Sequence, residues 1–267
     1  MRIIIIISLL TALLFSAFER ISQSPIQVAT GFSSFFEDGS PLEFLSHPAS
    51  LSKTNQISTA LFYSSPFQLK QLNHYGAYLS SPFKTFAIGT GFATFGNTLY
   101  RESIASVAVA KEFGHHFRFG LVASAMEVSI KNYGSTRTAG ISTSIDYHLI
   151  ETIRWSLAYH NLNAPRIGKS GELLPQVVIT GITYSPSRSI TAVIEVEKDL
   201  EFDSRYKFGV HWRPFFPLCI ASGFVNHPVQ VTGGFTFEIK GQKISYAIAT
   251  HPDLSVSQVF ALRISLP

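Results

Sequence analysis

Residues 194–212 read IEVEKDLEFDSRYKFGVHW, and apolar side chains alternate with charged ones along this stretch. A period of two is typical of a β-strand with one face in an apolar environment. The polar positions of the first half are acidic: Glu195, Glu197 and Asp199. Those of the second half are basic: Arg205, Lys207, His211 and Arg213. The stretch predicts an antiparallel hairpin that turns near Phe202 and Asp203, with one apolar face and one ion-paired face.

Two architectures can accommodate a hairpin with one apolar and one charged face. In a soluble sandwich, the apolar face points into a core and the charged face meets bulk water. In a membrane barrel, the apolar face meets lipid and the charged face lines the interior. Opposite charges facing each other across strands stabilise either arrangement by a few tenths to about 1 kcal/mol per pair. The hairpin alone therefore predicts a β protein and leaves the kind of core open.

The composition favours the barrel. Hydrophobic residues make up 46% of the 267-residue chain and charged residues only 14%, against roughly 25% charged residues in an ordinary soluble domain. The chain also holds 23 Phe and 10 Tyr. The formal net charge of +4 is spread along the chain without a run of Lys and Arg. Because a basic patch is the footprint of nucleic-acid binding, we expect no nucleic-acid partner.

The rest of the chain after residue 55 falls into similar amphipathic segments. Turn-forming residues interrupt it at intervals of about 10–16 residues, as in YSSPF at 63–67 and LSSPF at 79–83. Pro and Gly at such joints mark the places where strand hydrogen bonding stops. The segments predict an all-β transmembrane antiparallel barrel of about 14 strands, each about 9–13 residues long, a length that suits tilted membrane strands.

The last stretch, SVSQVFALRISLP at 255–267, again alternates with a period of two. In a closed barrel the last strand pairs with the first, so that neither strand leaves an open edge. We therefore expect the segment around Phe260 and Leu262 to pair with the first strand of the barrel.

The N-terminus, MRIIIIISLLTALLFSAF, is typical of a secretory leader. One cation, Arg2, precedes an apolar run from Ile3 to Leu14, which is short for a membrane-spanning helix of about 20 residues. We expect a cleaved signal peptide at 1–22 and export to the bacterial outer membrane; an uncleaved anchor is the alternative. The single cysteine, Cys219, excludes an internal disulfide and is interpreted as a small hydrophobe.

Two further segments follow from this division of the chain. We expect residues 23–55 to form a plug or periplasmic segment and residues 56–267 to form the barrel. The stretch GFSSFFEDGSPLEF places three aromatic candidates in the plug: Phe35, Phe36 and Phe44. They either gate a ligand path or simply anchor the segment against the barrel wall, and the sequence leaves both open.

Three kinds of chemical site find little support in the sequence. His115 and His116 are adjacent, so that on a strand they point to opposite faces, and no Cys or carboxylate pair joins them at zinc-ligand spacing. The acidic row from Glu195 to Glu201 is too extended for calcium, whose ligands come from a curved loop. No G-x-S-x-G nucleophile motif appears. We expect no metal, no cofactor and no enzymatic activity.

The C-terminal third resembles a known family. The matching features are a GxxW strand at 209–212, the pair Gly223-Phe224, GGFTF at 233–237, ISYAI at 244–248 and the final serine-started strand. SHPASLS at 46–52 resembles the Asn-Pro-Ala signature that precedes the first strand, with His47 and Pro48 at its first two positions. Together these features resemble the PorV/PorQ-like outer-membrane proteins, which belong to the FadL-like barrels.

The resemblance implies a fourteen-stranded barrel whose N-terminal segment, with His47 and Pro48, folds into or across the interior. It also implies a non-enzymatic accessory of type IX protein secretion or surface retention, with outer-membrane lipid, secretion-machinery components and exported proteins as partners. The first alternative is a FadL-like passive transporter of hydrophobic small molecules. The second is a secreted soluble β-sandwich that binds a partner.

Overall fold

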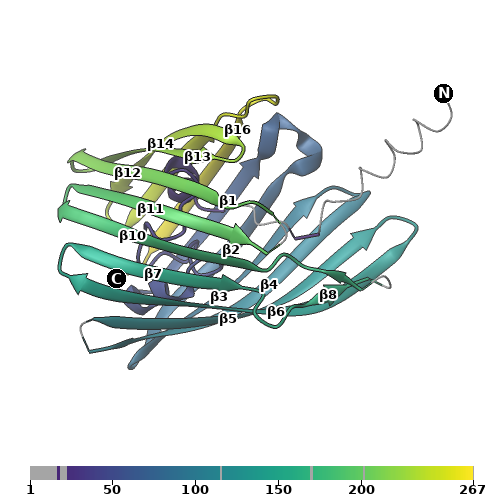
Figure 1. Ribbon diagram of the computed structural model, residues 1–267, viewed down its shortest axis with the longest axis horizontal. Coiled ribbons are helices and arrows are strands. Elements are labelled where there is room, and N and C mark those ends of the chain that lie inside the picture. Colours follow the sequence, from purple (N-terminus) through teal and green to yellow (C-terminus); the bar gives the residue numbers. More distant parts are fainter. Residues whose placement is uncertain (1–16, 19–22, 115, 169–170, 201, 267) are drawn as a thin grey trace.

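A computed structural model describes residues 17–18, 23–114, 116–168, 171–200 and 202–266. Fourteen strands form one closed barrel in which every neighbouring pair is antiparallel (Figure 1). The strands of the barrel are β1 (Ser58–Ser65), β2 (His74–Phe83), β3 (Phe86–Gly96), β4 (Tyr100–Phe113), β5 (Phe117–Ile130), β6 (Gly134–Ile150), β7 (Ile153–His160), β10 (Val177–Ser187), β11 (Ile190–Asp199), β12 (Arg205–Phe215), β13 (Leu218–Asn226), β14 (Val229–Ile239), β15 (Gln242–Ala249) and β16 (Ser257–Ser265). The predicted fold class and strand number are confirmed.

The barrel closes between its first and last strands. β1 pairs with β16 in antiparallel register, with Leu61 opposite Leu262 and Tyr63 opposite Phe260. The expectation that the last segment pairs with the first strand is confirmed, and the closed barrel replaces the sandwich alternative. Closure leaves no strand of the barrel without a neighbour on either side, which is the condition for a sheet to stand in lipid.

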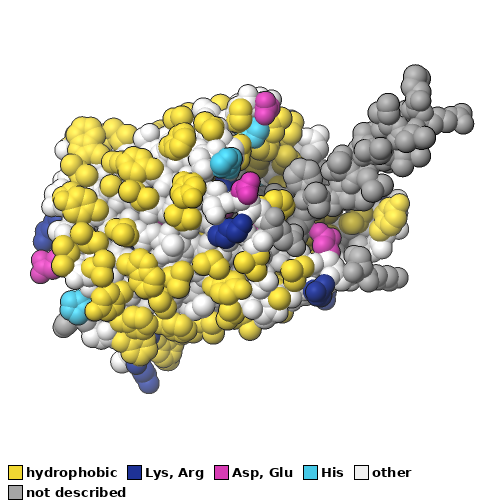
Figure 2. Space-filling view, viewed as in Figure 1, with side chains coloured by type: hydrophobic (Ala, Val, Ile, Leu, Met, Phe, Trp, Pro, Cys, Tyr) yellow, Lys and Arg dark blue, Asp and Glu magenta, His cyan; other side chains and the backbone are white. Residues whose placement is uncertain are grey.

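The alternation in the sequence becomes an inner and an outer surface. Along β1, buried and exposed residues alternate without interruption up to the last position. The outer surface carries large exposed apolar side chains, among them Phe92, Ile194 and Phe224. Figure 2 shows hydrophobic side chains spread over the visible outer wall, with few charged ones among them. This apolar outer surface fits a hydrocarbon environment.

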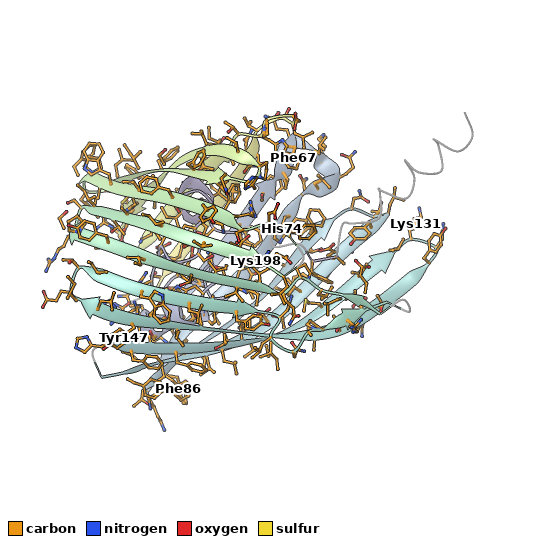
Figure 3. All side chains as sticks on the ribbon, viewed as in Figure 1. Phe67, His74, Phe86, Lys131, Tyr147 and Lys198 are labelled. Atoms are coloured by element: carbon orange, nitrogen blue, oxygen red, sulfur yellow. The ribbon has the colours of Figure 1, made fainter. Side chains whose placement is uncertain are left out.

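The two ends of the barrel differ. Tight connections such as 84–85, 151–152 and 240–241 lie at the end that also holds the C-terminus, and we call it the turn end. The other end, the loop end, carries the longer connection 66–73 and the small hairpin of β8 (Arg166–Ile167) and β9 (Glu172–Leu173). In Figure 3, Phe86 and Tyr147 lie toward the turn end and Lys131 at the loop end.

Strand length varies more than the sequence predicts. β4 and β5 have 14 residues each and β6 has 17, against eight in β1 and β15. β7 pairs with β6 only from Thr143 onward, so that residues 134–142 of β6 extend beyond β7 at the loop end. In GSTRTAG at 134–140 polar residues occupy both faces of the strand, so that the apolar alternation stops before the strand does.

Helices are short and few among the described residues. They are α2 (Pro25–Ala29) and the 3-10 helices η1 (Pro48–Lys53), η2 (Pro66–Gln68) and η3 (Lys70–Leu72). None of them has the length and apolar character needed to cross a membrane. The predicted leader at 1–22 lies outside the described residues, apart from Ala17 and Phe18.

Residues 23–55, here called the inner segment, lie within the barrel. Its helix α2 contacts β13 to β16, and η1 contacts β3 to β6 on the opposite wall. Two wall glycines permit this close approach. A Cβ at Gly120 would lie 2.2 Å from the carbonyl carbon of Pro48, and one at Gly223 would lie 2.1 Å from the backbone nitrogen of Gly31. Only glycine fits at either position, because the backbones themselves meet there.

Candidate ligand-binding site inside the barrel

A buried ion-pair cluster joins the inner segment to the wall on the turn side of the barrel. Asp146 of β6 is fully buried, and its Oδ1 lies 2.8 Å from Nε2 of His47. The Ser156 hydroxyl donates to the same oxygen at 2.5 Å. Nε of Arg118, also fully buried, lies 3.2 Å from Asp146 Oδ2. The cluster therefore compensates each buried charge with an opposite one, as burial requires.

Asp38 extends this cluster from the inner segment. Its Oδ2 lies 3.0 Å from Arg118 and 2.5 Å from Arg154 of β7. Arg154 also donates to the backbone oxygen of Phe35 at 2.6 Å. Burial raises the pKa of Asp38, but the Arg154 and Arg118 guanidinium groups outweigh it and hold that pKa below 3.8. We call Asp38, His47, Arg118, Asp146 and Arg154 the turn-side cluster.

The turn-side cluster contains a possible cation-ligand set. The ligand atoms of Asp38, His47 and Asp146 all lie within 4.8 Å of one another. Arg118 and Arg154 already contact the two carboxylates. Their guanidinium groups supply the positive charge that a metal ion would bring, so the arrangement fits an ion-pair network rather than a metal site.

A second set of ion pairs joins Glu37 of the inner segment to strands β15 and β16. Its Oε1 lies 2.9 Å from Arg263 of β16 and 3.2 Å from Lys243 of β15. Burial raises the pKa of Glu37, but the charges of Lys243 and Arg263 hold it below 4.5. The inner segment is thus tied by charge to strands on both sides of the barrel.

The predicted acidic and basic rows face the interior, and their pairing differs in part from a simple ladder. Lys207 Nζ lies 2.6 Å from Glu197 and 2.9 Å from the Phe32 oxygen. Glu195, opposite Lys207 in register, instead accepts the backbone N–H groups of Ser34 and Phe35 at 2.8 Å and the Ser33 hydroxyl. Glu195 therefore holds the inner segment.

The remaining charged candidates lie nearer the rims. Arg205 pairs with Glu197 at 3.1 Å, at the loop end. Arg213 lies at the turn end, where its Nε donates to the sulfur of Cys219 at 3.2 Å. Asp199 is half-buried at the end of β11. The sulfur of Cys219 is buried inside the barrel, on the face opposite the lipid.

Each aromatic candidate of the inner segment packs against another ring, which belongs either to the barrel wall or to the inner segment itself. Phe44 packs edge-on to Tyr78 at 5.3 Å between ring centroids. Phe36 packs in the same way against His211 at 5.4 Å, and Phe35 against His47 at 5.0 Å. Pro48 begins η1. The structure thus brings His211 of the basic row together with an aromatic of the inner segment.

A cavity of about 140 Å³ lies on the loop side of the inner segment. Its wall comes from β2 to β7 and β10, and its floor includes Gln27, Leu42, Leu45 and Ser46. Apolar groups from the wall include Ala93, Phe95, Ile104, Val122, Met126 and Val177. Polar groups include His74, Thr94, Glu102, Ser124, Ser142, His160 and Asn161. Although polar and apolar residues are about equally frequent in the lining, the surface that faces the cavity is mainly apolar, as it usually is in small-molecule sites.

The floor of this cavity rests on a buried carboxyl group without a basic partner among the described contacts. The Gln27 amide donates to both the Glu43 carboxyl and the Ser46 hydroxyl. Glu43 is fully buried. Burial, together with the charge of Glu37, raises its pKa well above 4.5. Glu43 thus differs from the ion-paired Glu37 and Asp38, although all three belong to the inner segment.

Sequence reasoning missed the groups that hold the inner segment: Asp38, Glu43, Arg118, Asp146 and Arg154. A signal for two of them was present. Arg118 occupies an inward position of β5, whose other inward residues are small or apolar, and Asp146 lies between Ser144 and His148 on the inward face of β6. A charge at such a position needs a partner within the barrel. The partner in the inner segment could not be read from the spacing.

Comparisons with known proteins support the fold. No protein-family model matches the chain, and no curated protein matches its sequence. The solved toluene transporter TbuX of Ralstonia pickettii is similar, with a TM-score of 0.71 and 11% identity over 91% of this chain and 98% of that one. The toluene transporter TodX of P. putida gives 0.69 and 11% over 92% and 99%.

A Pseudomonas aeruginosa FadL homologue is also similar, with a TM-score of 0.63 and 9% identity over 93% of this chain and 99% of that one. At these identities the likeness establishes the FadL-like barrel architecture. The narrower resemblance to PorV/PorQ-like proteins receives no support from these neighbours.

Proposed function

We propose that this protein is a non-enzymatic outer-membrane barrel that passes small hydrophobic molecules. The observation that carries the proposal is the mostly apolar cavity between the inner segment and the loop end. Contact with lipid accounts for the apolar outer surface of the barrel, but it does not account for an apolar cavity in the interior. Its similarity in fold to two toluene transporters and a FadL homologue supports the transport alternative over the secretion-accessory hypothesis.

In this proposal the inner segment acts as the plug. It closes the turn side of the barrel, which faces the periplasm if the usual orientation of outer-membrane barrels applies, with short turns on the periplasmic side and longer loops outside. The turn-side cluster and the ion pairs of Glu37 fix the plug. The ligand enters from the loop end and rests on Gln27, Leu42 and Leu45 before it moves on. The energy comes from the ligand's own gradient, since the proposal requires no chemical step.

The secretion-accessory hypothesis remains a prediction from sequence. It requires a surface for exported proteins, and the described contacts lie within the barrel. The charged rows that the sequence predicted serve, in our proposal, to hold the plug. Glu195 accepts backbone hydrogen bonds from Ser34 and Phe35, and Lys207 reaches Phe32.

A matched pair of variants on β5 tests the proposal. Ser124 lines the cavity, whereas the next residue, Ala125, is exposed on the outer face. Ser124→Phe fills part of the cavity, and Ala125→Phe adds the same ring to the lipid side. We would measure binding of 4-fluorotoluene by fluorine NMR to the purified protein in lipid nanodiscs, with empty nanodiscs as the baseline for partition into lipid.

We expect saturable binding to the wild type and to Ala125→Phe, and at least a tenfold weaker affinity for Ser124→Phe. Heat-modifiable migration of each variant on gels would show that its barrel is folded. If a folded Ser124→Phe binds as tightly as the wild type, or if the wild type binds no more than the empty nanodisc, the proposed function is wrong.

A further inference from the structure

His74 stands at the edge of the cavity as the first residue of β2 (Figure 3). It faces inward and is only 5% exposed. Its ring packs edge-on against Phe62, with 4.8 Å between centroids, and against Phe95, with 6.3 Å. Two aromatic rings therefore fix the imidazole in place at the cavity wall.

The imidazole of His74 lacks a hydrogen-bond partner among the described residues, and its Nδ1 is buried without one. Two other histidines of the barrel interior each have at least one partner, although Nδ1 of His47 is also buried without one. His47 bonds to Asp146, and His148 accepts from Arg118 at 3.1 Å. Buried polar groups are nearly always hydrogen-bonded, and each exception calls for an explanation. Nε2 of His74 has no described partner either, and a hydrogen-bonding ligand in the adjoining cavity would supply one there.

Several other polar groups at this cavity already bond within the protein, whereas Gln23 Oε1, which also lines it, is buried without a partner among the described residues. The Thr94 hydroxyl donates to the Glu102 backbone oxygen at 3.0 Å, and the Ser124 hydroxyl pairs with that of Ser106 at 2.7 Å. The Ser142 hydroxyl accepts from the Asn161 backbone N–H at 3.1 Å. These groups would offer a ligand less than the unpartnered imidazole does.

We propose that the cavity prefers a single-ring molecule with one hydroxyl group, a simple phenol, whose hydroxyl bonds to His74. This inference rests on the proposed function and specifies its substrate class. A cavity of about 150 Å³ with apolar lining is known to hold benzene, and the cavity here is about 140 Å³. The ring of the ligand packs against the apolar lining while its hydroxyl reaches the imidazole edge.

The choice of a hydroxyl over a charged group follows from the neighbouring chemistry. A neutral imidazole has one N–H donor and one acceptor nitrogen, and a phenolic hydroxyl both donates and accepts. A carboxylate ligand would meet the Glu102 side chain, which also lines the cavity, and like charges at short range repel each other. A charged amine would lose its hydration in a mostly apolar cavity.

The test compares two ligands of nearly equal shape, 4-fluorophenol and 4-fluorotoluene, on the wild type in nanodiscs. His74→Phe keeps an aromatic ring and removes the hydrogen-bonding nitrogens. The matched control is His251→Phe. His251 belongs to a nearby loop and packs edge-on against Phe67 at 5.2 Å, but it does not line the cavity. Binding is measured by fluorine NMR and corrected for partition into the lipid of empty nanodiscs.

We expect His74→Phe to weaken 4-fluorophenol binding on the order of tenfold, the usual contribution of one hydrogen bond, and to leave 4-fluorotoluene within about twofold. His251→Phe should change neither. His74→Gln, which restores a donor and an acceptor, should regain part of the preference for the phenol. As a readout that needs no variant, the imidazole ¹⁵N signals of His74 should shift with 4-fluorophenol and not with 4-fluorotoluene.

The outcomes separate this inference from the proposed function. If both ligands bind, but equally well to the wild type and His74→Phe, or if the His74 signals respond equally to both, the preference for a hydroxyl is wrong and transport of apolar molecules stands. If neither ligand binds above the empty nanodisc, the cavity is not a ligand site, and the proposed function fails together with this inference.

Discussion

The two halves of the barrel interior are built from different interactions. On the turn side, charged groups of the inner segment meet opposite charges of the wall, as Asp38 meets Arg118 and Arg154. On the loop side, a cavity is lined mainly by apolar groups and holds an imidazole, His74, without a described hydrogen-bond partner. One half holds the inner segment by opposite charges, and the other leaves space that a ligand can occupy.

This difference indicates how one barrel can be closed and still receive a ligand. Buried ion pairs and backbone contacts at glycine hold the inner segment against the wall in a single arrangement. The loop half keeps open space and free hydrogen-bonding capacity, which a ligand can use. The following predictions test whether the two halves can be disturbed separately.

The largest effect is expected at Asp146. Asp146→Ala leaves Nε2 of His47 without its hydrogen-bond partner and removes one of the two carboxylates that compensate Arg118. Removing one member of a buried ion pair costs about 3–5 kcal/mol. We expect the free energy of unfolding, measured by urea titration in lipid, to fall by that amount. Ion conductance in planar bilayers should rise, because the inner segment loses its hold.

The matched control is Glu127→Ala on the neighbouring strand β5. Glu127 pairs with Arg137 at 2.8 Å, but that arginine side chain is 77% exposed, and exposed pairs contribute about 0–1 kcal/mol. Equal losses in Asp146→Ala and Glu127→Ala would show that the turn-side cluster does not hold the inner segment.

A smaller effect is expected at Gly120. The Cβ of Gly120→Ala would fall 2.2 Å from the Pro48 backbone, so that η1 must move. Overpacking of this kind costs about 1–3 kcal/mol. Gly233→Ala is the control, because the nearest atom to its Cβ, the Ala221 oxygen, lies 3.7 Å away. Thermal unfolding in detergent should separate the two variants; a Gly233→Ala variant as unstable as Gly120→Ala would contradict the close-packing account.

The next prediction concerns pH and two carboxyl groups of the inner segment. The pKa of Glu43 is raised by burial and by Glu37, so its contribution to stability is present below pH 4.5 and is lost as pH rises through the raised value. The pKa of Glu37 is lowered despite burial, because Lys243 and Arg263 outweigh it. Its contribution is present above pH 4.5 and is lost as pH falls through the lowered value.

Glu43→Gln keeps the shape and removes the titration. As the pH rises from about 5 to about 9, we expect the unfolding temperature of this variant to fall less than that of the wild type. Glu37→Gln should lose the stabilising ion pairs at neutral pH. Superimposable pH profiles for Glu43→Gln and the wild type would contradict a raised pKa at Glu43.

The smallest effect is expected at Arg213. The sequence places it in one row with Lys207, but the structure separates them: Lys207 is buried against Glu197, and Arg213 lies at the turn end beside Cys219. We expect Arg213→Ala to change the free energy of unfolding by less than about 1 kcal/mol and Lys207→Ala to change it more. The reverse order in a urea titration would show that the rim contact matters more than the buried one.

Much of the wall could be predicted from sequence because each strand carries its own alternation. The hairpin with Glu197 and Arg205 has the expected turn and facing rows, and the closing pair of Leu61 and Leu262 follows from the need to remove edges. The hairpin depends on neighbouring segments alone, and the closing pair follows from a general rule about open edges, so that neither requires the path of the inner segment.

The candidate site could be predicted only in part, because its contacts join residues far apart in the chain. His47 and Asp146 are separated by 99 positions, and Glu195 bonds to Phe35 across 160. Phe35, Phe36 and Phe44 could be found as aromatics of the inner segment, but their partners depend on how the segment crosses the barrel. The position of the cavity and the surroundings of His74 also depend on how the inner segment crosses the barrel. The alternation of residues along the strands does not predict that course.

The most direct test of the account is a crystal structure of the purified protein soaked with 4-bromotoluene, with the bromine located by its anomalous signal. The account predicts a peak within the cavity bounded by Leu42, Phe95 and Val122, on the loop side of the inner segment, and an intact turn-side cluster. Bromine peaks confined to the outer surface, or on the turn side of the inner segment, would contradict it.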